Sequence, residues 1–142
     1  MKSNKGFSLI ELMVAVAVVG IISVIAIPAY TTYSMRGRIP EATSNLATSR
    51  ISMEQYFLDN HTYLGADTAG VCTQGNASSK YFTFSCSPLN ATTYTIQATG
   101  IGSMTGFTYT IDQNNTKQTP AAPGAWGPAS TTCWITKTGG AC

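Results

Sequence analysis

Ionisable side chains are scarce in this 142-residue sequence, where Lys, Arg, Asp and Glu together make up 10%, against about a quarter in an average protein. There is one histidine, His61, and no Cys-x-x-Cys pair, so the usual spacings of a zinc site are absent. Glu41 and Glu54 are thirteen residues apart and fall on different faces of a helix. The stretch 112–115 offers a single carboxylate, which favours a plain hairpin turn over a calcium loop. We therefore expect neither an enzyme nor a metal or cofactor site.

The positive net charge of the sequence comes from its first six residues. Two of the eight basic residues, Lys2 and Lys5, precede a long apolar run, and side-chain charge falls from +2 to zero without the first six residues. The remaining cations form no stripe interleaved with aromatics of the kind that follows a phosphate backbone. We therefore do not expect nucleic acid as a partner.

An apolar run dominates the amino-terminal part. It extends over eighteen residues from Leu12 to Ala29, and no charge occurs between Leu12 and Met35. As a helix rising about 1.5 Å per residue it would be about 27 Å long, close to the roughly 30 Å hydrocarbon core of a bilayer. A secretory signal has a shorter apolar core. The run predicts a single membrane span, and the two lysines before it place the amino terminus in the cytoplasm.

Glu11 stands directly before this run. A carboxylate at the centre of a membrane costs about 2.5–3.5 kcal/mol, and less near an end. An acid in that position needs a partner, and the sequence offers none within the segment.

The stretch Lys5-Gly6-Phe7-Ser8-Leu9-Ile10-Glu11, followed by the long run, resembles the class III signal of type IV prepilins and type II secretion pseudopilins. The resemblance implies that a prepilin peptidase cuts between Gly6 and Phe7 and methylates the new Phe7 nitrogen. It also implies that Glu11 pairs with the terminal amine of a neighbouring subunit during assembly. Removing one partner of a buried pair typically costs about 3–5 kcal/mol, so such a pair would both drive and align assembly. A plain membrane anchor with an incidental glutamate is the alternative.

The resemblance also implies where the chain resides and what it meets. The precursor is a single-pass protein of the inner membrane, and the mature subunit lies in an extracellular pilus. Its partners are the prepilin peptidase and methyltransferase, an inner-membrane assembly platform, and other pilins in a homo- or hetero-polymer. The expected organisation is a leader at 1–6, a transmembrane and polymerisation helix at 7–30, and a head at 31–142 that includes the rest of the helix.

Gly20 and Pro28 are weak points in the apolar helix. Proline removes one backbone hydrogen bond and kinks a helix. The resemblance implies that this stretch bends or melts as the helix moves from bilayer to filament, and a tolerated membrane kink is the alternative.

A second helical stretch is predicted from Glu41 to Leu58, with Pro40 in its first turn and an interruption between Ser34 and Pro40. Two apolar stripes run along it at helical spacing. One contains 42, 46, 53, 56 and 57, and the other contains 47, 51 and 58. We infer that the first packs on the subunit's own sheet and the second on neighbouring subunits, unless a thick core covers both.

The second half alternates in the manner of strands. Strands are predicted at Tyr81–Ser85, Tyr94–Thr99, Phe107–Asp112 and Cys133–Thr136, with an irregular loop at Thr119–Thr132. Short connections favour antiparallel pairing. The fold class is α+β, a long amino-terminal helix packed on a small antiparallel sheet, which is the lollipop plan of type IV pilins. Phe107, Trp126 and Trp134 serve either in the core or as adhesive surface aromatics.

Four cysteines lie in the second half, and three pairings are possible. An even number in a membrane-targeted chain indicates disulfides formed in an oxidising compartment. We favour the sequence-adjacent pairs, Cys72–Cys86 and Cys133–Cys142, of which the second resembles the carboxy-terminal pairing of pilins. We expect a structural pilus subunit, of low abundance, serving adhesion, twitching motility or DNA uptake. The alternative is a type II secretion pseudopilin.

Overall fold

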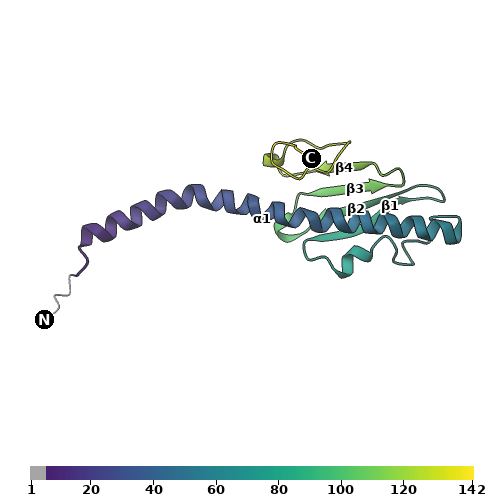
Figure 1. Cartoon of the computed structure of the whole chain (residues 1–142), viewed down its shortest axis with the longest axis horizontal. Coiled ribbons are helices and arrows are strands. Elements are labelled where there is room, and N and C mark those ends of the chain that lie inside the picture. Colours follow the sequence, from purple (N-terminus) through teal and green to yellow (C-terminus); the bar gives the residue numbers. More distant parts are fainter. Residues whose placement is uncertain (1–5) are drawn as a thin grey trace. The chain divides into compact units, whose positions relative to one another are not determined.

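The computed structural model describes residues 6–142, so Lys2 and Lys5 of the expected leader lie outside it. The chain divides into two units, Met1–Ser34 and Met35–Cys142. Helix α1 (Leu9–Asn60) supplies residues to both, and the second unit, called the head here, also holds all the strands (Figure 1).

Helix α1 is continuous over 52 residues, so the predicted interruption between Ser34 and Pro40 is wrong. Pro40 lacks the N–H that would bond the carbonyl one turn earlier, a loss of about 3 kcal/mol. Its neighbours Ile39 and Ala42 are buried against the head, and burying a residue the size of isoleucine contributes about 1.5–3 kcal/mol. The Ser44 hydroxyl also donates to the Pro40 carbonyl at 2.6 Å. Packing of this face therefore keeps the helix intact through the proline.

Four strands form one antiparallel sheet in the order β1-β2-β3-β4. They are β1 (Phe82–Leu89), β2 (Tyr94–Gly100), β3 (Thr108–Asp112) and β4 (Lys117–Ala121). The first three agree with the predicted strands to within a few residues. In β2 the buried positions alternate strictly, as expected of a strand with one face on the core. The second half of α1 lies across that face (Figure 1).

The fourth strand lies elsewhere than predicted. Cys133–Thr136 is not a strand, and β4 occupies Lys117–Ala121 instead, including the first residues of the predicted irregular loop. Pro120 argues against a strand because it cannot donate to a ladder. β4 is nevertheless permitted because it forms the sheet edge, and its pairing with β3 shifts register beside the proline.

The core of the head lies between α1 and the sheet. Its largest fully buried side chains come from both elements and from the loops, and they are Ile39, Leu46, Met53, Phe82, Tyr94, Ile96, Met104, Phe107, Tyr109, Ile111 and Ile135. Phe107 meets Trp126 edge-on, with ring centroids 5.0 Å apart. Both rings are buried and belong to the core, whereas Trp134 is half-buried and packs against the core with part of its ring exposed.

Gly100 cannot be replaced by a larger residue, because the backbone of Met104 lies too close to it. A Cβ on Gly100, the last residue of β2, would lie 1.9 Å from the Met104 carbonyl oxygen. Real Cβ contacts are never that short, so the turn after β2 closes only over glycine. That turn leaves Ser103 exposed at the surface and brings Phe107 into the core.

Candidate processing and assembly site

Glu11 has a partner inside its own segment, contrary to the expectation from the sequence. Its Oε2 accepts a hydrogen bond from the Ser8 backbone N–H at 2.9 Å. The Ser8 carbonyl accepts the first helical bond, from Leu12 N at 3.2 Å, which makes Ser8 the N-cap of α1. Ser at the N-cap with Glu three residues later is the capping-box pattern, in which the acid satisfies one of the free N–H groups of the first turn.

Gly6 and Phe7, the expected cleavage pair, immediately precede this cap. Gly6 is exposed, and 84% of the Phe7 side chain is exposed. A hypothetical Cβ on Gly6 meets no atom within 4 Å. The peptide between the two residues is therefore accessible in the described part of the chain.

The apolar run emerges from the cap with its side chains uncovered. An 18-residue window of α1 has a mean hydropathy of 2.8 with none of it buried. Exposed residues include Leu12, Val16, Val19 and Ile25, each more than half exposed. Exposed apolar surface of this extent is characteristic of a face that lipid or protein covers.

The predicted weak points lie within unbroken helix. Gly20 contacts nothing at its Cβ position within 4 Å. The hydroxyls of Thr31 and Thr32 donate to the Pro28 carbonyl at 2.9 and 3.0 Å. Helical hydrogen bonding continues on both sides of Pro28, and bending or melting at these two residues remains a prediction.

The two stripes of the second helical stretch separate as expected. Ala42, Leu46 and Met53 are completely buried against the sheet, whereas Ile51 is 57% and Leu58 is 74% exposed. The exposed stripe therefore has no cover within the described chain, in agreement with a contact between subunits.

Glu41 fastens the loop before β1 to the helix. Its Oε1 accepts hydrogen bonds from the backbone N–H groups of Lys80 and Tyr81, both at 2.8 Å, and from the Ser79 hydroxyl. Partial burial by itself raises the pKa of Glu41, but these hydrogen bonds and the Lys80 charge outweigh it, so the net pKa is lowered. The donors lie about forty positions away in sequence, and no local pattern at Glu41 could have revealed this role.

Glu54 joins the distal end of α1 to the sheet. It accepts hydrogen bonds from the Tyr94 hydroxyl at 3.0 Å and from the Tyr63 hydroxyl at 3.3 Å. Burial and the neighbouring Glu54 carboxylate raise the pKa of both tyrosines, so both remain neutral donors. Arg50 Nη2 reaches the Gln113 carbonyl at 3.5 Å. These contacts fix the distal end of the helix to the sheet and to the turn after β3.

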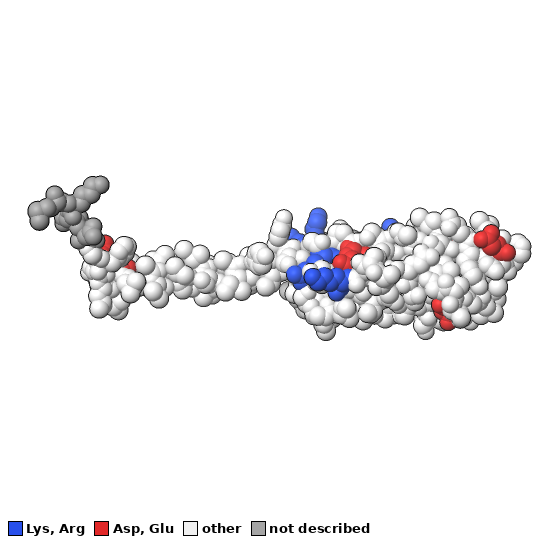
Figure 2. All heavy atoms as spheres, turned by 90° about the horizontal axis from the view of Figure 1, so that it is seen from below, with Lys and Arg blue, Asp and Glu red and all other residues white. Residues whose placement is uncertain are grey.

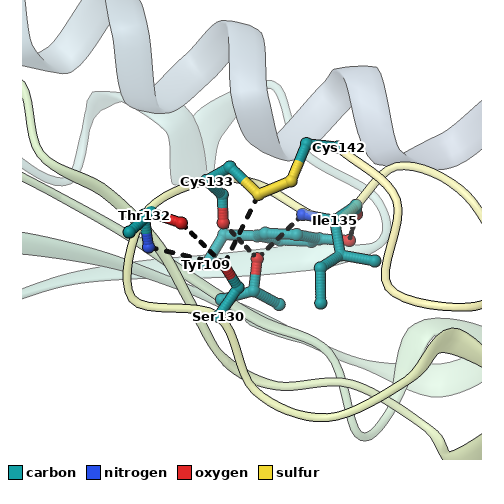
Figure 3. The surroundings of a disulfide bond; sticks show 7 residues. Tyr109, Ser130, Thr132, Cys133, Ile135 and Cys142 are labelled. Carbon is teal, nitrogen blue, oxygen red and sulfur yellow. Dashed lines mark hydrogen bonds between the residues drawn. A yellow bond between two sulfur atoms is a disulfide. The ribbon is translucent and has the colours of Figure 1, made fainter.

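The carboxy-terminal loop is held by an isolated backbone bridge between Thr119 and Ser130 and by side-chain hydrogen bonds (Figure 3). Thr119 Oγ1 donates to the Cys133 carbonyl at 3.0 Å and accepts from the Ile135 N–H at 2.9 Å. The Tyr109 hydroxyl donates to the Ile135 carbonyl at 2.9 Å. The structure joins Cys133 to Cys142 across this loop and Cys72 to Cys86 elsewhere in the head, the sequence-adjacent pairing.

Within residues 6–142 no three His, Cys, Asp or Glu side chains gather as metal ligands would. His61 is exposed and follows the last residue of α1 with a positive φ of 56°. The 112–115 stretch forms the hairpin turn between β3 and β4, where Asp112 Oδ1 accepts backbone bonds from Asn114 and Thr116.

Comparison with known proteins identifies this arrangement. A family described as "Type IV minor pilin ComP, DNA uptake sequence receptor" matches residues 28–119, and a "Prokaryotic N-terminal methylation motif" matches residues 1–27. The chain belongs to the type IV pilins, in the family of the minor pilin ComP. The prepilin resemblance is thereby confirmed, and a pilin is favoured over the pseudopilin alternative.

Curated relatives are also fimbrial proteins. A fimbrial protein of Neisseria meningitidis serogroup B is 38% identical over 79 residues, covering 55% of this pilin and 46% of the relative. The major pilin PilE of Neisseria gonorrhoeae is 36% identical over 79 residues, covering 55% and 47%. A Pseudomonas aeruginosa fimbrial protein is 38% identical over 68 residues, covering 48% and 44%. This pilin thus spans about half the length of the curated relatives it matches.

The fold has a solved counterpart. The crystal structure of the non-core minor pilin PilV of Neisseria meningitidis matches with a TM-score of 0.56, covering 65% of this chain and 92% of that one. Sequence identity is 19%, so the likeness concerns the fold. It confirms the predicted α+β plan of a long helix with an antiparallel sheet.

Proposed function

We propose that this pilin is a minor structural subunit of a type IV pilus. The observation that carries the proposal is the apolar run Leu12–Ala29 of α1, in which no residue is buried and which directly follows the capped Glu11. A surface of that kind suits a membrane span before assembly and rod packing after it. The precursor is held in the inner membrane with its amino terminus in the cytoplasm, and the mature subunit belongs to an extracellular filament.

Processing prepares the assembly contact. The prepilin peptidase cuts the exposed Gly6–Phe7 bond and the Phe7 nitrogen is methylated. The Glu11 carboxylate, bonded to the Ser8 N–H within its own chain, then pairs with the Phe7 amine of a neighbouring subunit at the assembly platform. Exchange of a neutral N–H donor for an ammonium strengthens the bond, because charge-assisted hydrogen bonds are about twice as strong as neutral ones.

The exposed stripe of α1 extends this contact into the head. Ile51 and Leu58 lie on the face of the helix opposite the sheet. Covering them with neighbouring subunits removes apolar surface from water. The stripe and the apolar rod together supply the polymer contacts with other pilins.

Mass spectrometry of sheared filaments tests the processing. We expect the chain in this fraction to begin at Phe7, to carry one methyl group on that nitrogen, and to contain both disulfides. A Gly6→Val variant should accumulate uncut in membranes and be missing from the filaments. Recovery of the uncut chain in filaments would contradict the proposal.

DNA uptake is a second candidate role for the filament. The matched family is described as a DNA uptake sequence receptor. The head presents an exposed Lys117 whose Nζ lies 5.0 Å from the centre of the Trp134 ring. Both residues line a hollow of about 420 Å³ beside Pro40 and the Cys133–Cys142 bond. Proteins that bind nucleic acids combine cations, which attract the phosphates, with aromatic rings, on which bases stack.

Duplex binding by the full chain tests this second role. Lys137 is a second exposed cation, in the loop that the Cys133–Cys142 bond closes. We expect Lys117→Gln combined with Lys137→Gln to weaken binding and to reduce its dependence on salt. The matched control is Arg50→Gln, which removes a cation that is half-buried beside Gln113. Unchanged affinity in the lysine variant, or no binding by the parent chain, would exclude this surface as a DNA site.

A further inference from the structure

Three cations lie where the head begins, two of them on helix α1 and one in the loop before β1. Arg36 and Arg38 are the second and fourth residues of the unit Met35–Cys142, and Lys80 precedes β1. Arg36 and Lys80 are exposed and Arg38 is half-buried. Figure 2 shows blue cations gathered at one end of the head. We call Arg36, Arg38 and Lys80 the cationic collar.

Neutral groups hold the collar arginines in place. Arg36 Nη2 donates to the Thr138 hydroxyl at 2.8 Å, and Arg38 Nη1 donates to the Ser103 hydroxyl. The Arg38 guanidinium lies 4.4 Å from the centre of the Tyr81 ring. Such partners orient a guanidinium without neutralising it, so its charge remains available to an anion.

The third cation shares the same ring. Lys80 Nζ lies 5.7 Å from the centre of Tyr81. Glu41 interacts electrostatically with Lys80, and this one carboxylate offsets only one of the three positive charges. The collar therefore keeps a net positive charge.

The collar surrounds the helix instead of following one face. Two positions along an α-helix correspond to a rotation of about 200°. Arg36 accordingly reaches the carboxy-terminal loop, whereas Arg38 reaches the turn after β2. A polyanion such as duplex DNA meets cations aligned along one track, while lipid headgroups surround a helix on all sides.

We propose that the cationic collar binds the phosphates of anionic phospholipids, on the side of the membrane where the head lies, before the subunit enters the filament. This rests on the membrane stage of the proposed function. The apolar run ends at Ala29, and Arg36 follows seven residues later within α1, about 10 Å along a helix. The headgroup regions add about 10–15 Å over both leaflets, or about 5–7 Å on each side, so the Arg36 backbone lies just outside one headgroup layer. A long arginine side chain can reach back from there to the phosphates.

Aromatic residues between the run and the collar fit the same layer. Tyr30 is 73% and Tyr33 is 77% exposed. Tyrosine is enriched at the membrane–water interface, because its ring is apolar and its hydroxyl is polar. Arginine then offers two parallel N–H donors to a phosphate. The sequence from Ala29 to Arg38 thus passes from hydrocarbon to interface to phosphate in order.

The full chain in nanodiscs tests the proposal. Discs are made from phosphatidylcholine mixed with phosphatidylglycerol, and native mass spectrometry counts the lipids of each kind that stay bound to the released chain. We expect phosphatidylglycerol to be enriched over its share of the disc. Arg36→Gln/Arg38→Gln/Lys80→Gln should abolish the enrichment, with about fivefold lost per cation, and raised salt should weaken the enrichment in the parent chain.

Matched variants separate charge from folding. Arg36→Lys/Arg38→Lys keeps the charge and should keep most of the enrichment, and Lys117→Gln/Lys137→Gln should keep all of it. Equal phosphatidylglycerol counts for the parent chain and the collar variant would overturn the proposal. So would a collar variant that loses duplex DNA binding but retains its lipid preference. Insertion of the chain into the discs reports the membrane stage independently of headgroup preference.

Discussion

At the scale of single residues, the carboxylates of Glu11 and Glu41 accept hydrogen bonds from backbone N–H groups of this pilin. Glu11 meets the Ser8 N–H at 2.9 Å, and Glu41 meets two backbone N–H groups at 2.8 Å. The first pairing is local and the sequence could have revealed it, because Ser8 and Glu11 have capping-box spacing. The second depends on tertiary structure, which no sequence pattern near Glu41 encodes.

The Glu41 contact predicts a pH dependence. Its pKa is lower in the folded chain, so its stabilisation is full above the ordinary glutamate pKa of about 4.3. That stabilisation is lost as the pH falls from there through the lower folded pKa. Glu41→Gln should cost about 0.5–1.5 kcal/mol at neutral pH, since the carboxylate is partly solvent-exposed. Thermal unfolding should show the parent and variant converging at acidic pH, and a constant difference would contradict this role.

Thr119 predicts a larger effect at one buried hydroxyl. Thr119→Val keeps the shape but removes both the donor to the Cys133 carbonyl and the acceptor for the Ile135 N–H. Leaving buried polar groups unpaired costs about 1–3 kcal/mol. Urea unfolding in micelles measures the loss. Thr83→Val on an exposed position of β1 is the control, expected within about 0.5 kcal/mol of the parent.

At the scale of elements, the prediction from sequence succeeded where periodicity was strong and failed where packing overrides a local signal. The stripes of α1 and the strands β1 to β3 follow patterns of 3.6 and 2 residues. The predictions at Pro40 and Pro120 were wrong because proline locally disfavours both helix interiors and strands. Burial of Ile39 and Ala42 keeps α1 unbroken, and the edge position of β4 tolerates Pro120.

The two faces of α1 predict opposite mutational outcomes. Leu46→Ala removes a fully buried side chain and should cost about 2–5 kcal/mol of folding stability. Leu58→Ala removes a side chain that is 74% exposed and should change stability by less than about 0.5 kcal/mol. The second variant should nevertheless lower the amount of subunit in sheared filaments. Equal incorporation of Leu58→Ala and the parent would show that this stripe is not a polymer contact.

At the scale of the whole molecule, cations and carboxylates are unevenly distributed over the head although its net charge is close to zero. Side-chain charge is zero beyond the first six residues, yet Arg36, Arg38 and Lys80 gather at one end of the head. Figure 2 shows red carboxylates at its other end, and Glu54 and Asp59 lie in the last two turns of α1. Composition gives only the net charge. The uneven distribution arises from folding, which brings Lys80 and Arg38 to the same Tyr81 ring. The expectation that nucleic acid is not a partner rested on that net charge, and the duplex-binding measurement decides it.

The central claim is that one carboxylate converts a membrane protein into a filament subunit. The measurement that tests it most directly compares Glu11→Gln with the parent chain in sheared-filament and membrane fractions of the same cells, quantified by mass spectrometry. Glutamine keeps an acceptor for the Ser8 N–H but removes the charge that pairs with the Phe7 amine. We predict an unchanged amount in the membrane, normal cleavage after Gly6, and a loss of at least about tenfold from filaments, given the roughly 3–5 kcal/mol of a buried pair. Undiminished incorporation of Glu11→Gln would contradict the account.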